Sequence, residues 1–454
     1  MIQKILETPN SILKQKSKPI EKIDASIFKL AESLIETQKA NFGLGLAAPQ
    51  IGVLKRMIVY KQPKNQEIKE EIPLTILVNP EIVSFSKEIK ILEEACLSLP
   101  GISGEVTRAE KIEVKAIKLD LKNKSYSNVK FKTKGLHARI IQHEADHLDG
   151  ILLTDRVDDI TTIKKVPIPY KIVFAGTPEF SSIILENLIK NGWGISLVVT
   201  EPDRPAGRGK RLTSPPVKKF AQKKDLLVYR PEKISNLKSQ ILNLKPDLII
   251  VASYGQIIPK EIFEIPLRKT ICLHPSLLPK YRGSSPIQTA ILNGDKETGV
   301  TIFQVNEKID AGGIIANGKW QMANSITAGE LTKQLAKISA KLLTETLPDY
   351  LEGKIKLKKQ DEKKASWTKK ITKENGYIEK SEFQVARHQS LEKIERKIRA
   401  YYPWPKVWTK IDDKRIIIHK AHIENSKFIL DIVQPEGKRP AKYEEYLKGN
   451  PKIV

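Results

Sequence analysis

The segment QHEADHLDG, residues 142–150, holds two histidines and an acidic residue at a spacing that suits metal chemistry. His143 and His147 are four positions apart, so on a helix they lie one turn apart on the same face and can bind one ion. Glu144 stands beside them, where it can take a proton from an attacking water. Histidines on an exposed helix also show this spacing by chance, so the pattern needs a third ligand.

Cys96, in the segment EEACLSLPG, is one of only two cysteines, so a disulfide framework is implausible. Its thiolate would complete a Cys-His-His set and leave a fourth position for water, as a catalytic site requires. A cysteine that packs as a small hydrophobic residue is the alternative. Leu153 stands where metzincin peptidases have a third histidine, which excludes that family.

A third segment, GLGLAAPQIG at residues 43–52, brings glycines and an amide to the same part of the chain. The three segments, in this order, resemble the signatures of peptide deformylases over residues 1 to about 160. The resemblance implies a bound metal ion, water as the nucleophile, and formate and a free N-terminal methionine as products. It favours ferrous iron, although the ligand types also suit zinc, nickel or cobalt. Ala95, where the family usually has glycine, is a departure that we expect to be tolerated.

Individual roles are implied by the same resemblance. The implied metal ligands are Cys96, His143 and His147. The implied catalytic groups are the Glu144 carboxylate, which shuttles protons, and two oxyanion donors, the Gln50 amide and the Leu97 backbone N–H. The implied substrate contacts are Gly43 and Gly45.

A second motif, CLHPSLLPKYRG at residues 272–283, is followed by an aspartate at Asp310. It resembles folate-dependent formyltransferases, in which an amine attacks the formyl carbon of 10-formyltetrahydrofolate. The resemblance implies that His274 and Asp310 handle protons and oxyanion charge. The implied contacts to the folate co-substrate are Ser276, Leu277, Leu278, Pro279, Tyr254 and Gly255.

Cys272 stands where this family has its catalytic asparagine. A thiol is a weaker hydrogen-bond donor than an amide, and losing one oxyanion donor costs about a hundred- to a thousandfold in rate. Three outcomes stay open: a slow transferase, a rearranged site, or an inactive tRNA-binding module. A nucleophilic Cys272 would have only His274 as its base.

The loop EPDRPAGRGKRL, residues 201–212, is similar to one that methionyl-tRNA formyltransferases use to contact the acceptor stem. Its phosphate-binding candidates are Arg204, Arg208, Lys210 and Arg211. The alternative is a flexible basic loop. The C-terminal segments KIRAYYPWPKVWTKI and DIVQPEGKRPAKYEEYL are similar to the tRNA-binding domain of the same enzymes. We expect Tyr402 and Trp404 there to be core aromatics.

The charge balance favours a polyanionic partner; a lysine-rich surface that is only solvated is the alternative. Lysine and arginine number 78 against 53 acidic residues, a formal net charge of +25. No apolar run approaches the roughly 18 residues of a membrane-spanning helix, and the N-terminus lacks the pattern of a secretory signal. We therefore expect a cytoplasmic protein with no membrane contact.

The 454 residues suggest several domains. We expect an α+β deformylase-like domain over 1–162, then an α/β, doubly wound, parallel-sheet formyltransferase domain over 170–353, where strand and helix patterns alternate. A small OB-like β-barrel follows over 374–454. The predicted linkers cover about 163–169 and 354–373, the second of them polar and basic.

The sequence thus predicts a fusion of peptide deformylase with methionyl-tRNA formyltransferase. Its expected partners are initiator methionyl-tRNA and the ribosome or nascent formylated peptides. Two alternatives stay open. In one, an active deformylase carries a catalytically impaired tRNA- or ribosome-binding module, because Cys272 replaces the asparagine. In the other, the front domain is a general metallopeptidase.

Overall fold

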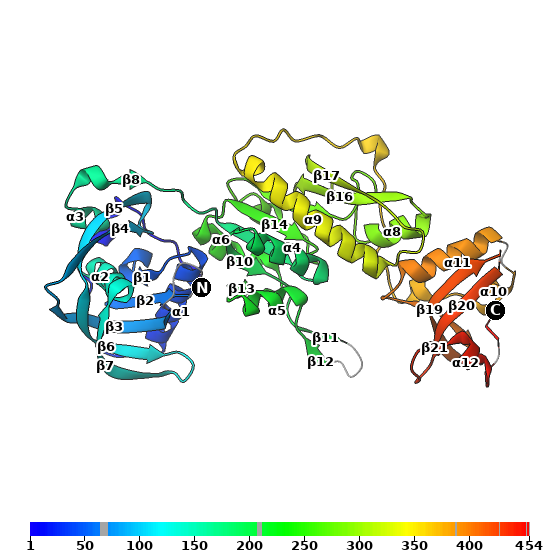
Figure 1. Cartoon of the computed structure of the whole chain (residues 1–454), viewed down its shortest axis with the longest axis horizontal. Helices are drawn as coiled ribbons and strands as arrows, with labels where there is room; N and C mark the ends of the chain where they lie inside the picture. The colour runs from blue at the N-terminus through cyan, green and yellow to red at the C-terminus, as the bar shows by residue number, and fades with distance from the viewer. Residues whose placement is uncertain (64–70, 207–210, 386–387, 426, 451, 454) are drawn as a thin grey trace.

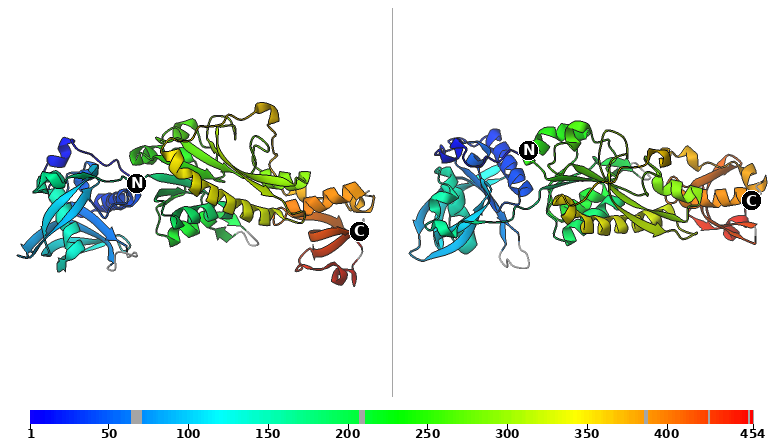
Figure 2. Two further views of the ribbon diagram at one scale, coloured as in Figure 1. Left: turned by 45° about the horizontal axis from the view of Figure 1, so that its top comes forward. Right: turned by 90° about the horizontal axis from the view of Figure 1, so that it is seen from above.

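The computed structural model describes residues 1–454 except 64–70, 207–210, 386–387, 426, 451 and 454. Three parts follow one another along a long axis, with the N-terminal part at one end and the C-terminal part at the other (Figures 1 and 2). Within the described residues, no helix is both long and apolar enough to span a membrane.

The N-terminal part is built on two antiparallel sheets. The larger sheet contains, in spatial order, β1 (Gly45–Ala47), β2 (Met57–Gln62), β3 (Ile72–Phe85), β6 (Lys111–Asp120) and β7 (Ser125–Lys134). The smaller contains β4 (Ile89–Cys96), β5 (Leu99–Ala109) and β8 (Lys164–Lys165). The helices are α1 (Ala25–Ala40), α2 (Gly135–Leu148) and α3 (Leu153–Arg156). This arrangement is the predicted α+β class.

Helix α2 carries the two-histidine motif and is held by burial of one apolar face. Ala138, Ile141 and Leu148 recur at helical spacing and are fully buried in a core shared with the larger sheet. The opposite face of the helix turns toward β4 and β5. The helix therefore has a fixed rotation, which aims its histidines at the smaller sheet.

The middle part is a seven-stranded sheet with helices on both faces. Its spatial order is β13 (Val228–Tyr229), β10 (Ile195–Val199), β9 (Ile172–Gly176), β14 (Leu248–Ala252), β15 (Thr270–His274), β16 (Glu297–Gln304) and β17 (Ile314–Gln321). Alternate residues of β9 enter two different cores, so both faces are buried and the strand is apolar throughout.

The sheet is mixed, which corrects the prediction of a parallel sheet. The first five strands are parallel, but β16 runs antiparallel to β15 and forms a hairpin-like pair with β17. The covering helices are α4 (Glu179–Lys190), α5 (Pro216–Lys223), α6 (Lys238–Leu244), α7 (Lys260–Phe263), α8 (Pro286–Asn293) and α9 (Ala328–Leu351). A small hairpin, β11 (Arg204–Ala206) with β12 (Arg211–Thr213), projects from this part (Figure 1).

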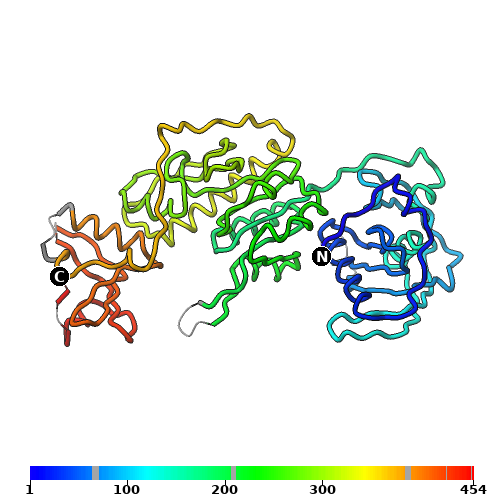
Figure 3. The backbone as a smooth tube through the Cα atoms, turned by 180° about the vertical axis from the view of Figure 1, so that it is seen from behind, coloured from blue at the N-terminus to red at the C-terminus, as the bar shows by residue number. Residues whose placement is uncertain are grey.

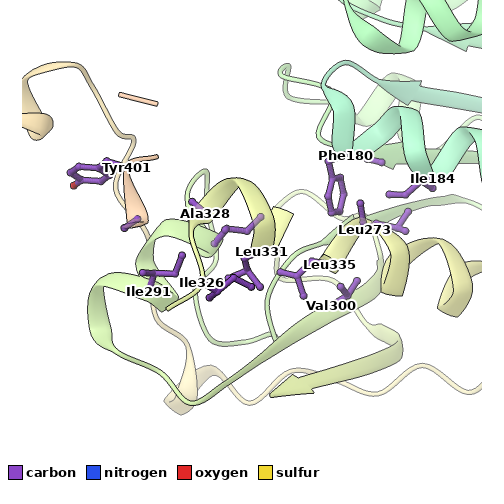
Figure 4. Packing of buried hydrophobic residues seen from close by; sticks show 14 of the residues in the cluster. Phe180, Ile184, Leu273, Ile291, Val300, Ile326, Ala328, Leu331, Leu335 and Tyr401 are labelled. Carbon is purple, nitrogen blue, oxygen red and sulfur yellow. The ribbon is translucent and has the colours of Figure 1, made fainter. Parts of the chain in front are cut away.

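One core joins the middle and C-terminal parts. Helix α9 starts with a capping box formed by Thr327 and Glu330, and its Leu331 and Leu335 pack near Val300 and Ile291 (Figure 4). Tyr401 belongs to the same cluster. The C-terminal part is therefore docked through apolar contacts.

The C-terminal part contains a four-stranded antiparallel sheet of β18 (Val407–Ile411), β19 (Lys414–Glu424), β20 (Lys427–Pro435) and β21 (Ala441–Lys442). Its helices are α10 (Lys380–Val385), α11 (His388–Ala400) and α12 (Tyr443–Leu447). Among the described residues, β18 and β21 are the edges and no ladder closes the sheet into a barrel.

The prediction for two aromatic residues was wrong. Tyr401 is buried, but the chain turns after α11 and leaves Tyr402 and Trp404 38% and 51% exposed. The segment before this part, 354–373, passes along the middle part (Figure 3), where Lys358 pairs with Ile314.

Candidate active sites

The first site lies where the end of β4 faces α2. In β4 alternate side chains share a face, so Glu94 and Cys96 both point inward. The Cys96 Sγ atom lies 3.2 Å from the Nε2 atom of His147. One ligand atom from each of Cys96, His143 and His147 falls within 4.8 Å of the others. The structure thus brings the three predicted ligands together.

Glu94 orients His143. The Nδ1 atom of His143 lies 2.9 Å from a carboxylate oxygen of Glu94, so Nδ1–H donates there and leaves Nε2 free to bind a metal. Arg108 and Arg139 also donate to Glu94. Burial would raise the pKa of Glu94, but hydrogen bonds from His143 and Arg108 hold it well below its usual range.

Asp146 extends this ion network. It accepts hydrogen bonds from Arg108, at 2.6 Å, and from Arg156. Sequence reasoning missed the whole network. Two signals could have found it, because Glu94 stands two residues before Cys96 on a strand, and Arg139 stands four residues before His143 on a helix.

The charges around Cys96 favour a thiolate. Burial alone would raise the pKa of the thiol, but His147 and His143 lower it well below its usual value. The donor set of one thiolate and two imidazoles, with a carboxylate holding one ring, fits a catalytic divalent metal.

Glu144 is buried beside the ligands, and its Oε2 atom has no hydrogen-bond partner. Burial raises the pKa of Glu144 to about 7, against the opposing effect of the two histidines. A Cβ atom on Gly45 would lie 2.2 Å from its Oε1 atom, so only glycine leaves room for this carboxylate. The arrangement gives a proton carrier matched to neutral pH.

Gln50 completes the site on the other side of Cys96. Its side-chain oxygen accepts from the Ala47 N–H, which orients the amide. Its Nε2 atom then donates toward Ser98 at 3.2 Å and lies 3.7 Å from Cys96 Sγ. The predicted oxyanion donor therefore faces the predicted metal ligands. Leu97 follows Cys96, and a Cβ on Gly43 would lie 2.7 Å from its Cδ1 atom.

A cavity of about 400 Å³ opens from this site. Its wall includes Gly43, Gly45, Gln50, Glu94, Cys96, Leu97, His143 and Glu144. Apolar side chains continue it outward, among them Leu44, Leu99, Leu136 and Ile140. An apolar side chain next to the reacting group fits such a cavity.

The second site lies at the carboxyl end of β15, where ligands bind in doubly wound folds. The Nε2–H of His274 donates to the backbone carbonyl of Tyr281 at 2.8 Å. Because a carbonyl only accepts, Nε2 carries a proton and the Nδ1 atom faces Asp310, 3.7 Å from its Oδ2 atom. His274 is thereby held with Nδ1 toward the acid.

Asp310 is positioned by backbone and side-chain contacts. The Gly283 N–H donates to its carboxylate at 2.7 Å, and the Gln360 amide donates to its carbonyl. Arg282 is almost fully buried and donates to both Gln360 and Glu362. Gln360 and Glu362, which follow α9, therefore help to position Asp310 and Arg282.

Cys272 is partly buried on the same face of β15 as His274, two residues away. Burial and the Asp310 carboxylate raise the pKa of its thiol well above the usual value. The thiol therefore stays protonated near neutral pH and is a poor nucleophile.

The residues predicted to contact folate make local contacts here. Ser276 donates to the Lys280 carbonyl at 2.7 Å, and Leu278 is buried. The segment from Leu277 to Pro279 thus lies in a tight turn beside β16, to which the Leu278 N–H donates through Thr301. Tyr254 is buried, and Gly255 has φ +100.

The basic loop begins beside the second site, because a Cβ atom on Gly255 would lie 2.8 Å from Glu201 Oε1, and it continues into the projecting hairpin (Figure 1). Arg204 and Arg211 are exposed on its strands, and Arg204 lies 3.7 Å from Glu201. Arg208 and Lys210 fall outside the described residues.

Known proteins match both the N-terminal part and the two parts that follow it. Residues 2–162 match the family model of polypeptide deformylase, residues 170–347 that of formyl transferase, and residues 377–431 that of its C-terminal domain. The methionyl-tRNA formyltransferase of Clostridium novyi (strain NT) is 37% identical over 307 residues, which cover 62% of this chain and 97% of that protein. The methionyl-tRNA formyltransferase of Bacillus subtilis (strain 168) is 36% identical over 306 residues, covering 62% and 94%.

A solved structure of a class I type b peptide deformylase from Acinetobacter baumannii, bound to Met-Ala-Ser, is 36% identical and covers 35% of this chain and 99% of that chain, with a TM-score of 0.32. The folds and sites define a two-centre enzyme of formyl-group chemistry, with a hydrolase centre and a transferase centre. The chain belongs to the methionyl-tRNA formyltransferase family, and it carries a peptide deformylase domain in front.

Proposed function

We propose that this chain catalyses two reactions of translation initiation. The front centre removes the formyl group from N-terminal formylmethionine, and the rear centre transfers a formyl group from 10-formyltetrahydrofolate to methionyl initiator tRNA. The observation that carries the proposal is the pair of polar sets: Cys96, His143 and His147 with Glu144, and His274 with Asp310.

At the front centre, Cys96, His143 and His147 would hold the metal, which supplies Lewis-acid polarisation and a more acidic water when bound. Glu144 takes a proton from the attacking water and gives it to the leaving amine. The Gln50 amide stabilises the oxyanion. The C–N bond of the formamide breaks, and formate and a free amine leave. The thiolate and imidazole ligands suit ferrous iron, and also zinc, nickel or cobalt.

At the rear centre, the methionyl amine attacks the formyl carbon and the bond from that carbon to folate nitrogen breaks. His274 accepts the proton of the amine at Nδ1, Asp310 stabilises the resulting imidazolium, and His274 then returns the proton to the departing folate nitrogen. The products are formylmethionyl-tRNA and tetrahydrofolate. We assign the folate contacts to the turn around Ser276 and to Tyr254 and Gly255.

The basic hairpin and the C-terminal part would bind tRNA. Arg204 and Arg211 stand exposed on a projecting element, where they can neutralise phosphates. We propose that the C-terminal four-stranded sheet acts as an OB-like module, and that nascent formylated peptides at the ribosome are the substrates of the front centre. A cytoplasmic location agrees with these partners.

Two assays on the purified full-length chain test the proposal. Methionyl initiator tRNA and 10-formyltetrahydrofolate should give formylmethionyl-tRNA, and formyl-Met-Ala-Ser with ferrous iron should release formate. Absence of both products above a no-enzyme background refutes the proposal. Binding of tRNA without formylation would instead support the impaired-module alternative, which the neutral Cys272 thiol motivates. Cleavage of unformylated peptides, with formyl peptides untouched, would support a general metallopeptidase.

A further inference from the structure

A short segment, residues 164–169, joins the two catalytic parts (Figure 3), and its residues 166–169 line the deformylase cavity; we call it the strap. Its first two residues form β8, which pairs antiparallel with Ile102 and Ser103 of β5. The Val166 N–H then donates to the Gly101 carbonyl at 3.0 Å. The start of the strap is therefore fixed to the deformylase sheet.

The rest of the strap forms a wall of the cavity. Residues 166–169 line it together with Cys96 and His143. A Cβ atom on Gly101 would lie 3.2 Å from Ile168 Cδ1, so the Ile168 side chain covers the backbone at that glycine. Ile168 still has 57% of its surface exposed. A large apolar side chain thus stands in the cavity wall with most of its surface open to a ligand.

Of residues 167–169 only Ile168 has an N–H to offer to a peptide strand. Pro167 and Pro169 have no N–H to donate and flank Ile168 on both sides. Recognition at this wall therefore depends mainly on side-chain contact. An apolar residue of the substrate would remove the surface of Ile168 from water, which is favourable in proportion to the area covered.

The transferase part holds the far end of the strap. Lys171, which also lines the cavity, donates its backbone N–H to Asp247 at 2.8 Å. Phe42, on the cavity wall, contacts the loop before β10, because a Cβ on Gly194 would lie 2.9 Å from its ring. The cavity is consequently a composite of both parts.

We propose that Ile168 is a specificity-determining residue for deformylation, contacting an apolar side chain downstream of the formylmethionine. This inference rests on the proposed deformylase function. The methionine side chain takes the inner cavity beside the reacting carbon, and the peptide leaves past the strap. The front centre then selects its peptide substrates through a cavity wall that is formed by the strap.

The test compares two formyl peptides on the full-length, metal-loaded protein: formyl-Met-Leu-Leu and formyl-Met-Gly-Gly. We expect the native chain to prefer the leucine peptide in kcat/KM. Ile168→Ala should reduce this preference about fivefold or more, since apolar pocket contacts contribute discrimination of about tenfold and upward. The kcat/KM for the glycine peptide should change less than about twofold, because glycine has no side chain that could contact Ile168. Ile168→Leu should keep the preference.

Ile160→Ala is the matched control, since Ile160 is a 77% exposed isoleucine that precedes the strap and does not line the cavity. The affinity of the product Met-Leu-Leu, measured by calorimetry, should fall in Ile168→Ala in parallel. An unchanged preference in Ile168→Ala, or an equal loss in Ile160→Ala, overturns the inference while leaving deformylation intact. No turnover of either peptide by the native chain overturns the deformylase function itself.

Discussion

Glu94 accepts a hydrogen bond from His143 across the gap between β4 and α2, with 2.9 Å between the carboxylate oxygen and Nδ1. The same carboxylate is held by Arg108 and Arg139. This contact fixes which histidine nitrogen faces the cavity, because Nδ1 is engaged and Nε2 is turned toward Cys96 and His147. The orientation of a predicted metal ligand is thus set by a carboxylate outside the predicted ligand set.

Replacing Glu94 with glutamine should weaken metal binding. The glutamine amide oxygen can still accept a hydrogen bond from His143. It lacks the negative charge of the carboxylate, which makes the imidazole of His143 a better metal ligand. Loss of such an outer contact costs about 10- to 100-fold in metal affinity. Competition with a chelator of known affinity measures the change. Glu105→Gln, on the exposed face of β5, is the control and should bind metal as the native chain does. Equal affinities for Glu94→Gln and the native chain would show that Glu94 has no such role.

Replacing Glu144 with glutamine should abolish proton transfer while preserving the fold. A positioned acid–base group contributes about 10²- to 10⁴-fold, so kcat for formate release should fall by that range. Formylation of methionyl-tRNA by the same preparation serves as the control, because His274 and Asp310 lie in the other part. A variant that keeps full deformylase activity would remove Glu144 from the mechanism.

Glu144→Gln should also change how the metal-free protein responds to pH. Because the folded pKa, about 7, lies above the ordinary 4.5, the folded chain binds this proton more tightly than the unfolded chain. Its contribution to the free energy of unfolding is therefore lost as pH rises from 4.5 to about 7. The difference between the folded and unfolded pKa of Glu144 corresponds to a change of about 3 kcal/mol in the free energy of unfolding.

Denaturant unfolding of the metal-free proteins at pH 5 and pH 8 measures this difference. Native chain and Glu144→Gln should be closer in stability at the lower pH, and the variant should gain at the higher pH. A gain of the same size at both pH values would contradict a buried carboxylate with a raised pKa.

Part of this site could be predicted from local spacing. The positions of His143 and His147 follow from helical periodicity, and the motif order pointed to Cys96. The partners of these residues could not be predicted in the same way. Arg108 and Asp146 are 38 residues apart, and only tertiary packing brings them to 2.6 Å. The strap was interpreted as a linker, because two lysines and two prolines carry no pattern that indicates a cavity wall.

In the middle part too, some features of the fold could be predicted from the sequence and others could not. Apolar runs such as 248–252 predicted buried strands, and they are buried. The direction of β16 could not be predicted, since an apolar strand buried on both faces reads the same whether it is parallel or antiparallel. The exposed Tyr402 and Trp404 were assigned to the core on residue type alone, whereas the turn after α11 decides their orientation.

Removing the two described arginines of the hairpin should weaken tRNA use without affecting deformylation. In the double variant Arg204→Ala with Arg211→Ala, KM for methionyl-tRNA should rise, and the slope of log affinity against log salt should fall by about 1 to 2, because each phosphate contact contributes about 0.9. Filter binding at several salt concentrations measures the slope.

The control for the hairpin is Lys130→Ala. Lys130 lies on β7 in the deformylase part, and its side chain is 61% exposed, as is that of Arg204. A loss of tRNA affinity of the same size in Lys130→Ala would mean that binding depends on overall charge rather than on the hairpin.

Replacing Cys272 with asparagine should accelerate formyl transfer. The thiol is a weak donor and stays protonated, because burial and Asp310 raise its pKa well above the usual value. An amide on the same face of β15 as His274 would donate a stronger hydrogen bond to the developing oxyanion, which contributes about 10²- to 10³-fold. Single-turnover formylation of methionyl-tRNA measures this rate. Cys272→Ala separates the contribution of the thiol itself: if it formylates as fast as the native chain, the thiol donates nothing, and only the asparagine variant should gain. An asparagine variant no faster than the alanine variant would show that this site has rearranged around the cysteine and no longer places a donor there.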